Sequence, residues 1–138
     1  MDNIVSALQS RPKSPTRLNR NSKIFKVIIE SIAEKKGEAV VSLDLRKIDE
    51  AVSDFFILTQ AQSSTQIKAI ADAIAFEVKE ATGERAYHRH DGAEWTLLDY
   101  VNVVVHIFTP EYRQFYDIEG LWADADRKEH IDSAERSE

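Results

Sequence analysis

Three stretches of the chain repeat apolar residues at the spacing of an α-helix. In residues 23–36 and 64–81 the apolar positions fall on one side of a helical wheel, and a third such pattern follows Pro110. Ser63, three residues before Gln66, fits a capping box at the start of the second stretch. A threonine directly before Pro110 is a typical helix start, because proline is tolerated in the first turn. The pattern therefore predicts helices over 23–36, over 64–81 and from Pro110 onward.

Five shorter stretches are rich in β-branched and aromatic residues, which predicts strands. They are residues 38–45, 53–60, 85–90, 94–99 and 103–108. The second is apolar on both faces, so we expect it in the centre of a sheet with a cover on each side. The link between the last two is so short that they should be antiparallel neighbours. The order of elements predicts an α/β or α+β fold, a mixed sheet of about five strands flanked by helices.

The two ends of the chain lack these patterns. Residues 1–21 are polar, contain two prolines and several basic side chains, and are predicted to form a flexible basic leader. Residues 126–138 are polar without an apolar stripe and are predicted to form a flexible tail. A single domain is therefore expected over residues 22–125.

The composition is typical of a protein in a reducing, aqueous compartment. The chain has no cysteine, which excludes disulfides, thiolate nucleophiles and thiolate metal ligands. Its first residues show no pattern of a secretory signal, and no apolar run approaches the roughly 18 residues of a membrane span. We therefore expect a cytoplasmic protein that makes no membrane contact.

Charge is distributed unevenly along the chain. Residues 1–26 hold six basic side chains and one acid, a net charge of +5; since the whole chain carries −6, the rest carries −11. A body this acidic repels nucleic-acid phosphates and favours a basic protein surface as its partner. For the leader two interpretations stay open, a weak RNA contact or a solvated arm without a partner.

Two groups of residues raise the question of catalysis. His88 and His90 would point to the same side of a strand, and with Asp91 they could bind a divalent metal ion, or they could form an exposed polar turn. His106 could act as a general base oriented by Asp99, or it could be a hydrogen-bonded histidine at the edge of an apolar face. The segment TQAQSSTQ, between a strand and a helix, lacks the glycines and the lysine of a phosphate-binding loop.

Aromatic residues are concentrated in one part of the chain. They are Trp95, Tyr100, Phe108, Tyr112, Phe115, Tyr116 and Trp122. Both faces of the predicted 94–99/103–108 hairpin are apolar, so one face should pack on helices while the other is covered by the final helix or by a partner protein. Tryptophan and tyrosine are frequent hot spots of protein interfaces, and the acids nearby would suit a basic partner.

Three blocks of sequence closely resemble the ribosomal silencing factor family, also called the Iojap-like family. They are DFFILTQAQSSTQIKAIADAI (54–74), EWTLLDYVNVVVHIF (94–108) and RQFYDIEGLWADA (113–125). The blocks occur in the family's order and spacing, and the resemblance covers roughly residues 23–125. Gly120 departs from the family's pattern, where a longer polar residue is usual, at a cost of roughly 1 kcal/mol in helix propensity.

The resemblance implies a nucleotidyltransferase-like fold without catalytic residues. It also implies a protein that needs no cofactor or metal and that binds the large ribosomal subunit through the subunit's fourteenth protein. Bound there, it would block joining with the small subunit and lower translation when nutrients are short. A homodimer that hides the same surface is compatible with this function. The alternative is a residual nucleotidyltransferase or a metal-dependent hydrolase. A nucleotidyltransferase site needs a Gly-Ser turn and paired acids for two metal ions, and the absence of both from the sequence argues against it.

Carried over to matching positions, the resemblance predicts eight residues that contact the ribosomal protein. They are Trp95, Asp99, Tyr100, His106, Phe108, Arg113, Tyr116 and Glu119. The large aromatic side chains would bury apolar area, and Asp99 and Glu119 would pair with lysine or arginine of the partner. His106 could orient a carboxylate in the contact, whereas Leu121 and Trp122 are expected in the core.

Overall fold

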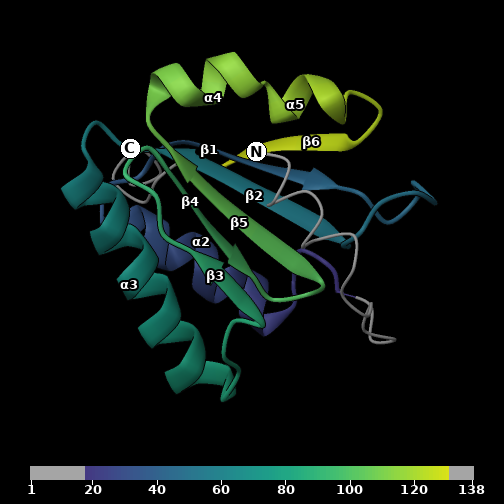
Figure 1. Cartoon of the computed structure of the whole chain (residues 1–138). Coiled ribbons are helices and arrows are strands. Elements are labelled where there is room, and N and C mark those ends of the chain that lie inside the picture. The colour runs from purple at the N-terminus through teal and green to yellow at the C-terminus, as the bar shows by residue number, and fades with distance from the viewer. Residues whose placement is uncertain (1–17, 131–138) are drawn as a thin grey trace, which may run out of the picture.

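The computed structural model describes residues 18–130, which form a mixed sheet with helices on both faces (Figure 1). The elements are α2 (Lys23–Glu34), β1 (Glu38–Asp44), β2 (Phe55–Gln60), α3 (Ser64–Thr82), β3 (His88–His90), β4 (Trp95–Asp99), β5 (Val103–Phe108), α4 (Pro110–Tyr116), α5 (Ile118–Leu121) and β6 (Asp126–His130). The strand order is β3-β4-β5-β2-β1-β6. The expected class, a mixed sheet flanked by helices, is confirmed. No helix in the described range is long and apolar enough to cross a membrane.

The helix ends form as the local sequence predicts. The Ser63 hydroxyl accepts a hydrogen bond from the Gln66 backbone N–H at 3.2 Å, which caps α3. At its other end Gly83 adopts a left-handed φ of 77°, which glycine does without strain. The Thr109 hydroxyl accepts from the Tyr112 N–H at 3.4 Å and so caps α4.

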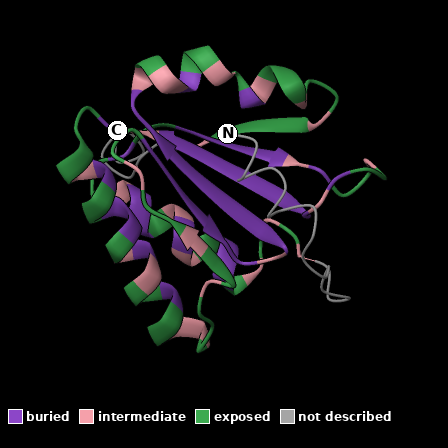
Figure 2. Ribbon diagram, in the orientation of Figure 1, coloured by how far each residue is buried: buried purple, intermediate pink, exposed green. Residues whose placement is uncertain are grey.

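The sheet is organised around its two central strands. β2 and β5 run parallel, whereas β4 with β5, β3 with β4, β2 with β1 and β1 with β6 run antiparallel. β2 is buried on both faces, which confirms the prediction of a central strand (Figure 2). The β4–β5 turn places Val101 at φ 71°, an unusual conformation for a β-branched residue. It is held by the Asp99 carboxylate, which accepts the Val101 N–H at 2.8 Å, and by the Ser53 hydroxyl, which donates to the Val101 carbonyl at 2.7 Å.

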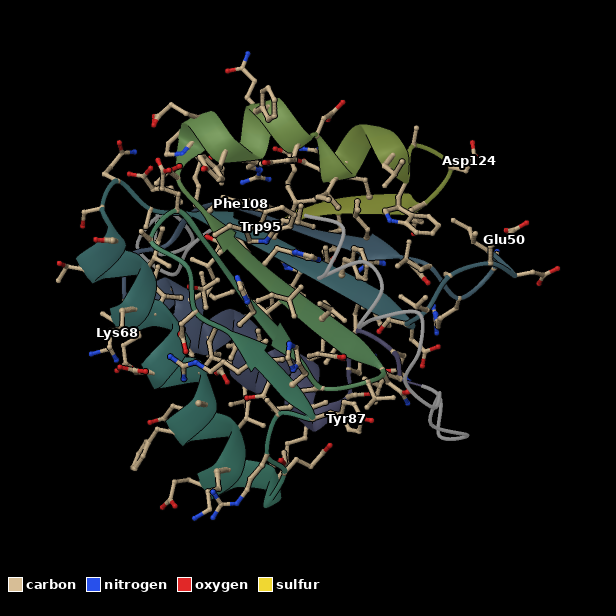
Figure 3. All side chains as sticks on the ribbon, in the orientation of Figure 1. Glu50, Lys68, Tyr87, Trp95, Phe108 and Asp124 are labelled. Carbon is tan, nitrogen blue, oxygen red and sulfur yellow. The ribbon has the colours of Figure 1, made fainter. Side chains whose placement is uncertain are left out.

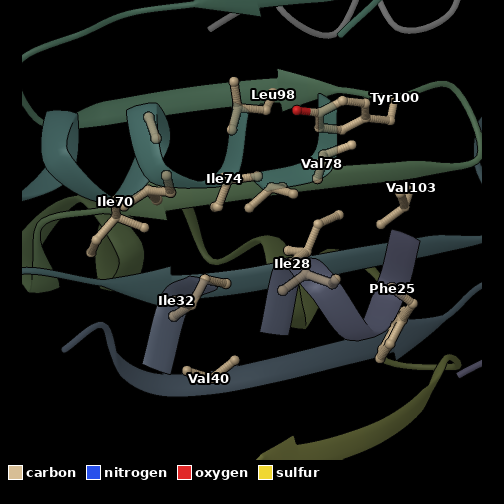
Figure 4. Packing of buried hydrophobic residues seen from close by; sticks show 14 of the residues in the cluster. Phe25, Ile28, Ile32, Val40, Ile70, Ile74, Val78, Leu98, Tyr100 and Val103 are labelled. Atoms are coloured by element: carbon tan, nitrogen blue, oxygen red, sulfur yellow. The ribbon is translucent and has the colours of Figure 1, made fainter. Parts of the chain in front are cut away.

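The sheet separates two hydrophobic cores, because successive residues of a strand point to opposite faces. One core packs α2 and α3 against the sheet, with Ile28 and Ile74 fully buried among strand residues (Figure 4). The other core lies between the opposite face and the α4–α5 segment, and it includes Leu58, Val104 and Ile118. The two helical layers therefore cover different faces of one sheet.

The structure differs from the sequence-based expectation at the C-terminal edge. Residues 126–130 were expected in a flexible tail, but they form β6, which pairs with β1 and makes six strands in the described part. An edge strand needs backbone hydrogen bonds on one side only, and charged side chains protect its free edge. Such a strand carries no apolar alternation, so the hydrophobic pattern cannot reveal it. Residues 131–138 of the expected tail lie outside the described residues.

The boundary of the expected leader also shifts. Residues 1–17 lie outside the described part, whereas residue 18 is already attached to the domain. The Leu18 N–H donates to the Asp54 carboxylate at 2.9 Å, and the Leu18 side chain packs on the α2–α3 core. The packed unit therefore begins before the predicted boundary at residue 22.

Candidate functional site

The two most exposed large hydrophobic side chains among residues 18–130 lie on α4 and α5. Phe115 is 79% exposed and Leu121 is 71% exposed. Residues 110–125 carry four acids and one arginine, so this segment is acidic as well as apolar. We define the α4–α5 surface as Glu111, Phe115, Tyr116, Asp117 and Leu121, of which Tyr116 is half-buried and the others exposed. Its combination of an exposed aromatic ring with negative charge fits a basic protein partner.

Arg113 fastens this surface to the sheet. Its guanidinium donates two hydrogen bonds to the Glu119 carboxylate, at 2.9 and 3.2 Å, and one to the Ala39 carbonyl of β1 at 2.8 Å. Arg127 of β6 donates to the same Glu119 carboxylate at 2.8 Å. Partial burial acts to raise the pKa of Glu119, but the two guanidinium groups lower that pKa below its ordinary value.

The network corrects the role expected for Glu119. The sequence predicts that Glu119 pairs with a cation of the partner, whereas its carboxylate already accepts from two arginines of its own chain. Arg113, also predicted as a contact residue, has a side chain only 10% exposed. Both residues therefore position α4 and α5 and are not offered to a partner.

His106 is a buried hydrogen-bond acceptor. Its ring nitrogen Nδ1 accepts from the Trp95 Nε1–H at 3.2 Å, and its ring is stacked on Phe108 with centroids 5.7 Å apart. Burial lowers the pKa of His106 to about 3, so the ring is neutral at neutral pH and carries its proton on Nε2. Nε2 is buried and has no partner among residues 18–130.

This arrangement does not fit the general base considered from the sequence. A general base must reach its substrate, and the His106 side chain is only 1% exposed. The expected orienting group, Asp99, does not bond to it; His106 bonds to Trp95. Asp99 instead holds the β4–β5 turn and is itself 1% exposed, so it cannot pair with a cation of a partner as the sequence predicts.

Three predicted contact aromatics are also covered within the chain. Trp95 is 6% exposed, Tyr100 6% and Phe108 0%. Figure 3 shows Trp95 and Phe108 between the sheet and α4, whereas Tyr100 belongs to the core on the α2–α3 side. The final helix, one of the two covers considered for the hairpin, closes the face that carries Trp95 and Phe108, whereas Tyr100 is covered on the other face. These aromatics therefore do not form a partner surface in this conformation.

Tyr116 connects the buried aromatics to the exposed surface. Its ring lies 5.2 Å from Trp95 on one side and 4.9 Å from Phe115 on the other, measured between centroids. It is the predicted contact residue that the structure leaves in a position to touch a partner. The α4–α5 surface is thus supported by a continuous row of rings that begins in the core.

A shallow depression adjoins this surface. It lies between the loop before β4 and α4, and it is lined by His90, Glu94, Trp95, Tyr112 and Tyr116, among others. A hydrogen bond from the Tyr112 hydroxyl to the Glu94 carboxylate raises the pKa of Tyr112. The depression places the carboxylate of Glu94 next to the α4–α5 surface.

Sequence reasoning misses Leu121, which it assigns to the core. The periodicity of the final segment assumes one continuous helix, but Asp117 adopts a left-handed φ of 43° and separates α4 from α5. The change of direction buries Ile118 and leaves Leu121 exposed. A helix-breaking conformation at an aspartate is compatible with the sequence, since Asp and Asn tolerate it best after glycine.

The residues considered for metal binding are not gathered into a site. His88 and His90 are exposed on the edge strand β3, and the Asp91 carboxylate accepts from Arg89 at 2.9 Å. Within residues 18–130 there is no group of three or more His, Cys, Asp or Glu side chains placed to hold a metal ion. The segment before α3 uses Ser63 as a helix cap.

Comparison with known proteins gives a consistent result. The family model described as "Ribosomal silencing factor during starvation" matches residues 19–138. The ribosomal silencing factor RsfS of Chromobacterium violaceum is 35% identical over 100 residues, which cover 72% of this chain and 81% of that protein. The RsfS of Bacillus subtilis is 33% identical and covers 78% of this chain and 91% of its own length. A crystal structure of a C. violaceum protein, 34% identical, superposes with a TM-score of 0.68 over 73% of this chain and 84% of that one.

Proposed function

This chain belongs to the ribosomal silencing factor family, and we propose that it represses translation by binding the large ribosomal subunit through the subunit's fourteenth protein. Bound there, it prevents the small subunit from joining. The family's description refers to starvation, which supports a role when nutrients are limiting. Such a protein acts in the cytoplasm, where the two subunits meet.

One observation supports a contact on the α4–α5 surface. The α4–α5 surface exposes Phe115 and Leu121, which are 79% and 71% exposed, in an acidic segment. A ribosomal protein that binds RNA has a basic surface, so opposite charges would steer the encounter. Burial of the exposed aromatic ring would then slow dissociation.

The proposed mechanism is steric and needs no chemical step. A folded body of about 100 residues has a radius of gyration near 13 Å, and two subunits must approach to contact distance to join. A body of this size on the joining surface keeps them apart for as long as it stays bound. The required property is therefore slow dissociation compared with the encounter of subunits.

The buried residues of the predicted set support the contact indirectly. Trp95 and Phe108 form the base on which Tyr116 rests, and the Arg113–Glu119 pair fixes α4 and α5 relative to β1. A surface that is fixed before binding loses less conformational entropy when the complex forms. These residues therefore contribute to affinity as positioning residues.

The test removes the two exposed apolar side chains. We expect the double variant Phe115→Ser/Leu121→Ser to lose at least about 2 kcal/mol of binding free energy, roughly thirtyfold in Kd, because hot-spot side chains contribute this much. Co-sedimentation with separated large subunits and binding to the isolated fourteenth protein measure the loss. A subunit-joining assay should show a matching loss of inhibition.

The matched control is Phe76→Ser on α3. Phe76 is 62% exposed, so its replacement also removes an exposed phenyl ring, but from the opposite face of the sheet. We expect this variant to bind and inhibit like the parent. Equal binding by the double variant and the parent would show that the contact lies elsewhere.

A homodimer through the same surface would compete with the ribosome. Because two copies would hide Phe115 and Leu121 from the partner, dimerisation would lower the inhibition of subunit joining at high protein concentration. Sedimentation of the parent and of the double variant over a range of concentrations measures this. Self-association that persists in the double variant would place the dimer contact on another part of the chain.

A further inference from the structure

A groove with basic side chains lies between α2 and β6, away from the α4–α5 surface. It is lined by Arg20, Phe25, Lys26, Ile29, Lys128 and His130, with Glu30 as the acid among the lining residues. On β6, Lys128 and His130 point toward α2, as the 5.8 Å centroid distance between His130 and Phe25 shows. Arg127, one residue along, points to the other face and pairs with Glu119. Because successive side chains of β6 point to opposite faces of the sheet, the groove and the acidic surface lie on opposite faces.

Two cations in this groove are unpaired in the described structure. Lys26 and Lys128 are both exposed, and neither side-chain ammonium group forms a hydrogen bond or an ion pair with any residue between 18 and 130. By contrast, the guanidinium groups of Arg113 and Arg127 on the other face are paired with Glu119. Two free ammonium groups that line one groove are suited to neighbouring phosphates of a nucleic-acid strand.

The remaining basic groups are held in place by the sheet. The Arg20 guanidinium donates to the Ser42 hydroxyl at 3.0 Å, and the His130 ring nitrogen Nε2 is 2.8 Å from the same hydroxyl. Arg20 also pairs with Asp126 at 3.5 Å, which takes up the charge of that acid. The groove therefore has a hydrogen-bonded polar wall beside two exposed lysine side chains.

The uneven charge of the chain favours an anionic ligand for this groove. Arg20 and Lys26 belong to the first 26 residues, whose net charge is +5, while the rest of the chain carries −11. Three further basic residues, Arg11, Lys13 and Arg17, precede the described part. Among the described lining residues three side chains are cationic and one is acidic, so the groove attracts a polyanion that the acidic domain otherwise repels.

We propose that the α2–β6 groove binds the phosphate backbone of RNA in the large ribosomal subunit, while the α4–α5 surface binds a ribosomal protein. This inference rests on the proposed function. The two contacts use opposite charges on opposite faces of the sheet, so they orient the domain on a surface made of both RNA and protein. Phosphate contacts position a protein without reading sequence, which suits a binder with one fixed place on the ribosome.

The test uses the full-length protein with Lys26→Gln/Lys128→Gln. The first probe is a fluorescein-labelled RNA hairpin alone. We expect the parent to bind it at 50 mM monovalent salt and to lose this binding toward 200 mM, as counterion release requires. The double variant should bind it about tenfold more weakly, with a slope of log K against log salt that is smaller by roughly 1–2.

The matched control is Lys47→Gln/Lys79→Gln. It removes the same charge from two exposed lysines outside the groove, so we expect its RNA affinity and salt slope to stay close to those of the parent. The second probe is the intact large subunit, which should show the same order of affinities. The third is the isolated fourteenth protein, for which both double variants should bind like the parent.

The outcomes separate this inference from the proposed function. No hairpin binding by the parent, or equal loss in both double variants, would overturn the groove as an RNA site whatever the ribosome experiments show. Hairpin binding that appears only after removal of residues 131–138 would make this acidic segment the occupant and overturn the proposal too. Failure of the parent to bind the fourteenth protein would refute the proposed function while leaving the groove's RNA binding measurable.

Discussion

The two faces of the sheet are covered in different ways. On one face α2 and α3, of 12 and 19 residues, bury a cluster made of aliphatic and aromatic side chains. On the other, α4 and α5 have only seven and four residues, and polar links join them to the sheet. The first layer buries two long helices against the sheet. The second carries Phe115 and Leu121, the two most exposed large hydrophobic side chains among residues 18–130, as a surface does when its packing is completed by a partner.

The comparison also shows where polar groups are tolerated inside the domain. The imidazole of His106 and the Arg113–Glu119 pair both lie on the α4–α5 side of the sheet. Buried polar groups cost free energy unless they are hydrogen-bonded, but their directional bonds fix one geometry. Helices as short as α4 and α5 are not stable on their own. The polar groups on this side therefore cost some stability but fix the orientation of the two helices.

The largest expected loss of stability follows from a substitution in the core on the α2–α3 side. Ile74 of α3 is fully buried, so Ile74→Ala should lower the free energy of unfolding by about 4 kcal/mol through lost burial and the cavity left behind. Phe115→Ala, on the other side, should change it by less than about 0.5 kcal/mol because the ring is exposed. Urea unfolding followed by circular dichroism measures both. Equal losses would mean that α4 is part of the main core.

The second effect is a pH dependence caused by His106. Its pKa is about 3 when folded and near 6.5 when unfolded, so between these values the unfolded state binds more protons. Stability should therefore fall as pH decreases below 6.5, by up to about 1.4 kcal/mol for each pH unit, until pH approaches 3.

The variant that isolates this contribution is His106→Gln. Glutamine can still accept the Trp95 N–H bond but does not titrate, so the variant should lose less stability than the parent between pH 6.5 and 4.5. Urea unfolding of the two proteins at matched pH values gives the difference, in which the contributions of the carboxylates cancel. Parallel curves would show that His106 is accessible to protons in the folded state.

The third effect concerns the link between α4 and the sheet. Arg113→Met removes hydrogen bonds to Glu119 and Ala39 and should lower the free energy of unfolding by about 2 kcal/mol. Arg127→Met removes a more exposed partner of the same carboxylate and should cost less than about 1 kcal/mol. Thermal unfolding compares them. If the order were reversed, β6 and not β1 would be the anchor of the α4–α5 segment.

Much of the α2–α3 side can be predicted from the sequence, because its elements follow local rules. The apolar stripe of residues 64–81, which includes Ile67, Ile74 and Val78, is confirmed as the buried side of α3, and its N-terminal cap forms at Ser63 as predicted. The central position of β2 follows from its apolar residues on both faces. Periodicity predicts such elements because long helices and central strands bury whole faces.

The α4–α5 side depends on features that periodicity does not contain. The left-handed conformation of Asp117 changes which residues face outward, and one of the two partners of Glu119 is Arg127, a residue of an edge strand without an apolar pattern. The resemblance to a family indicates which segment forms the contact, but not which of its side chains are exposed. Trp95 and Phe108 are therefore expected at the surface, whereas the structure places them beneath α4. Contacts between distant segments decide exposure, and these are not encoded locally.

The smallest effect separates charge from geometry on the α4–α5 surface. Asp117 adopts a left-handed conformation, and its carboxylate accepts the Gly120 N–H at 3.0 Å. Asparagine keeps both properties, so Asp117→Asn should change stability by less than about 0.5 kcal/mol. It removes one negative charge, so it should slow association with the fourteenth protein at 50 mM salt more than at 200 mM. Glu77→Gln on α3 is the control with the same charge change; stopped-flow rates that fall equally for both variants would show that net charge, and not this surface, steers the encounter.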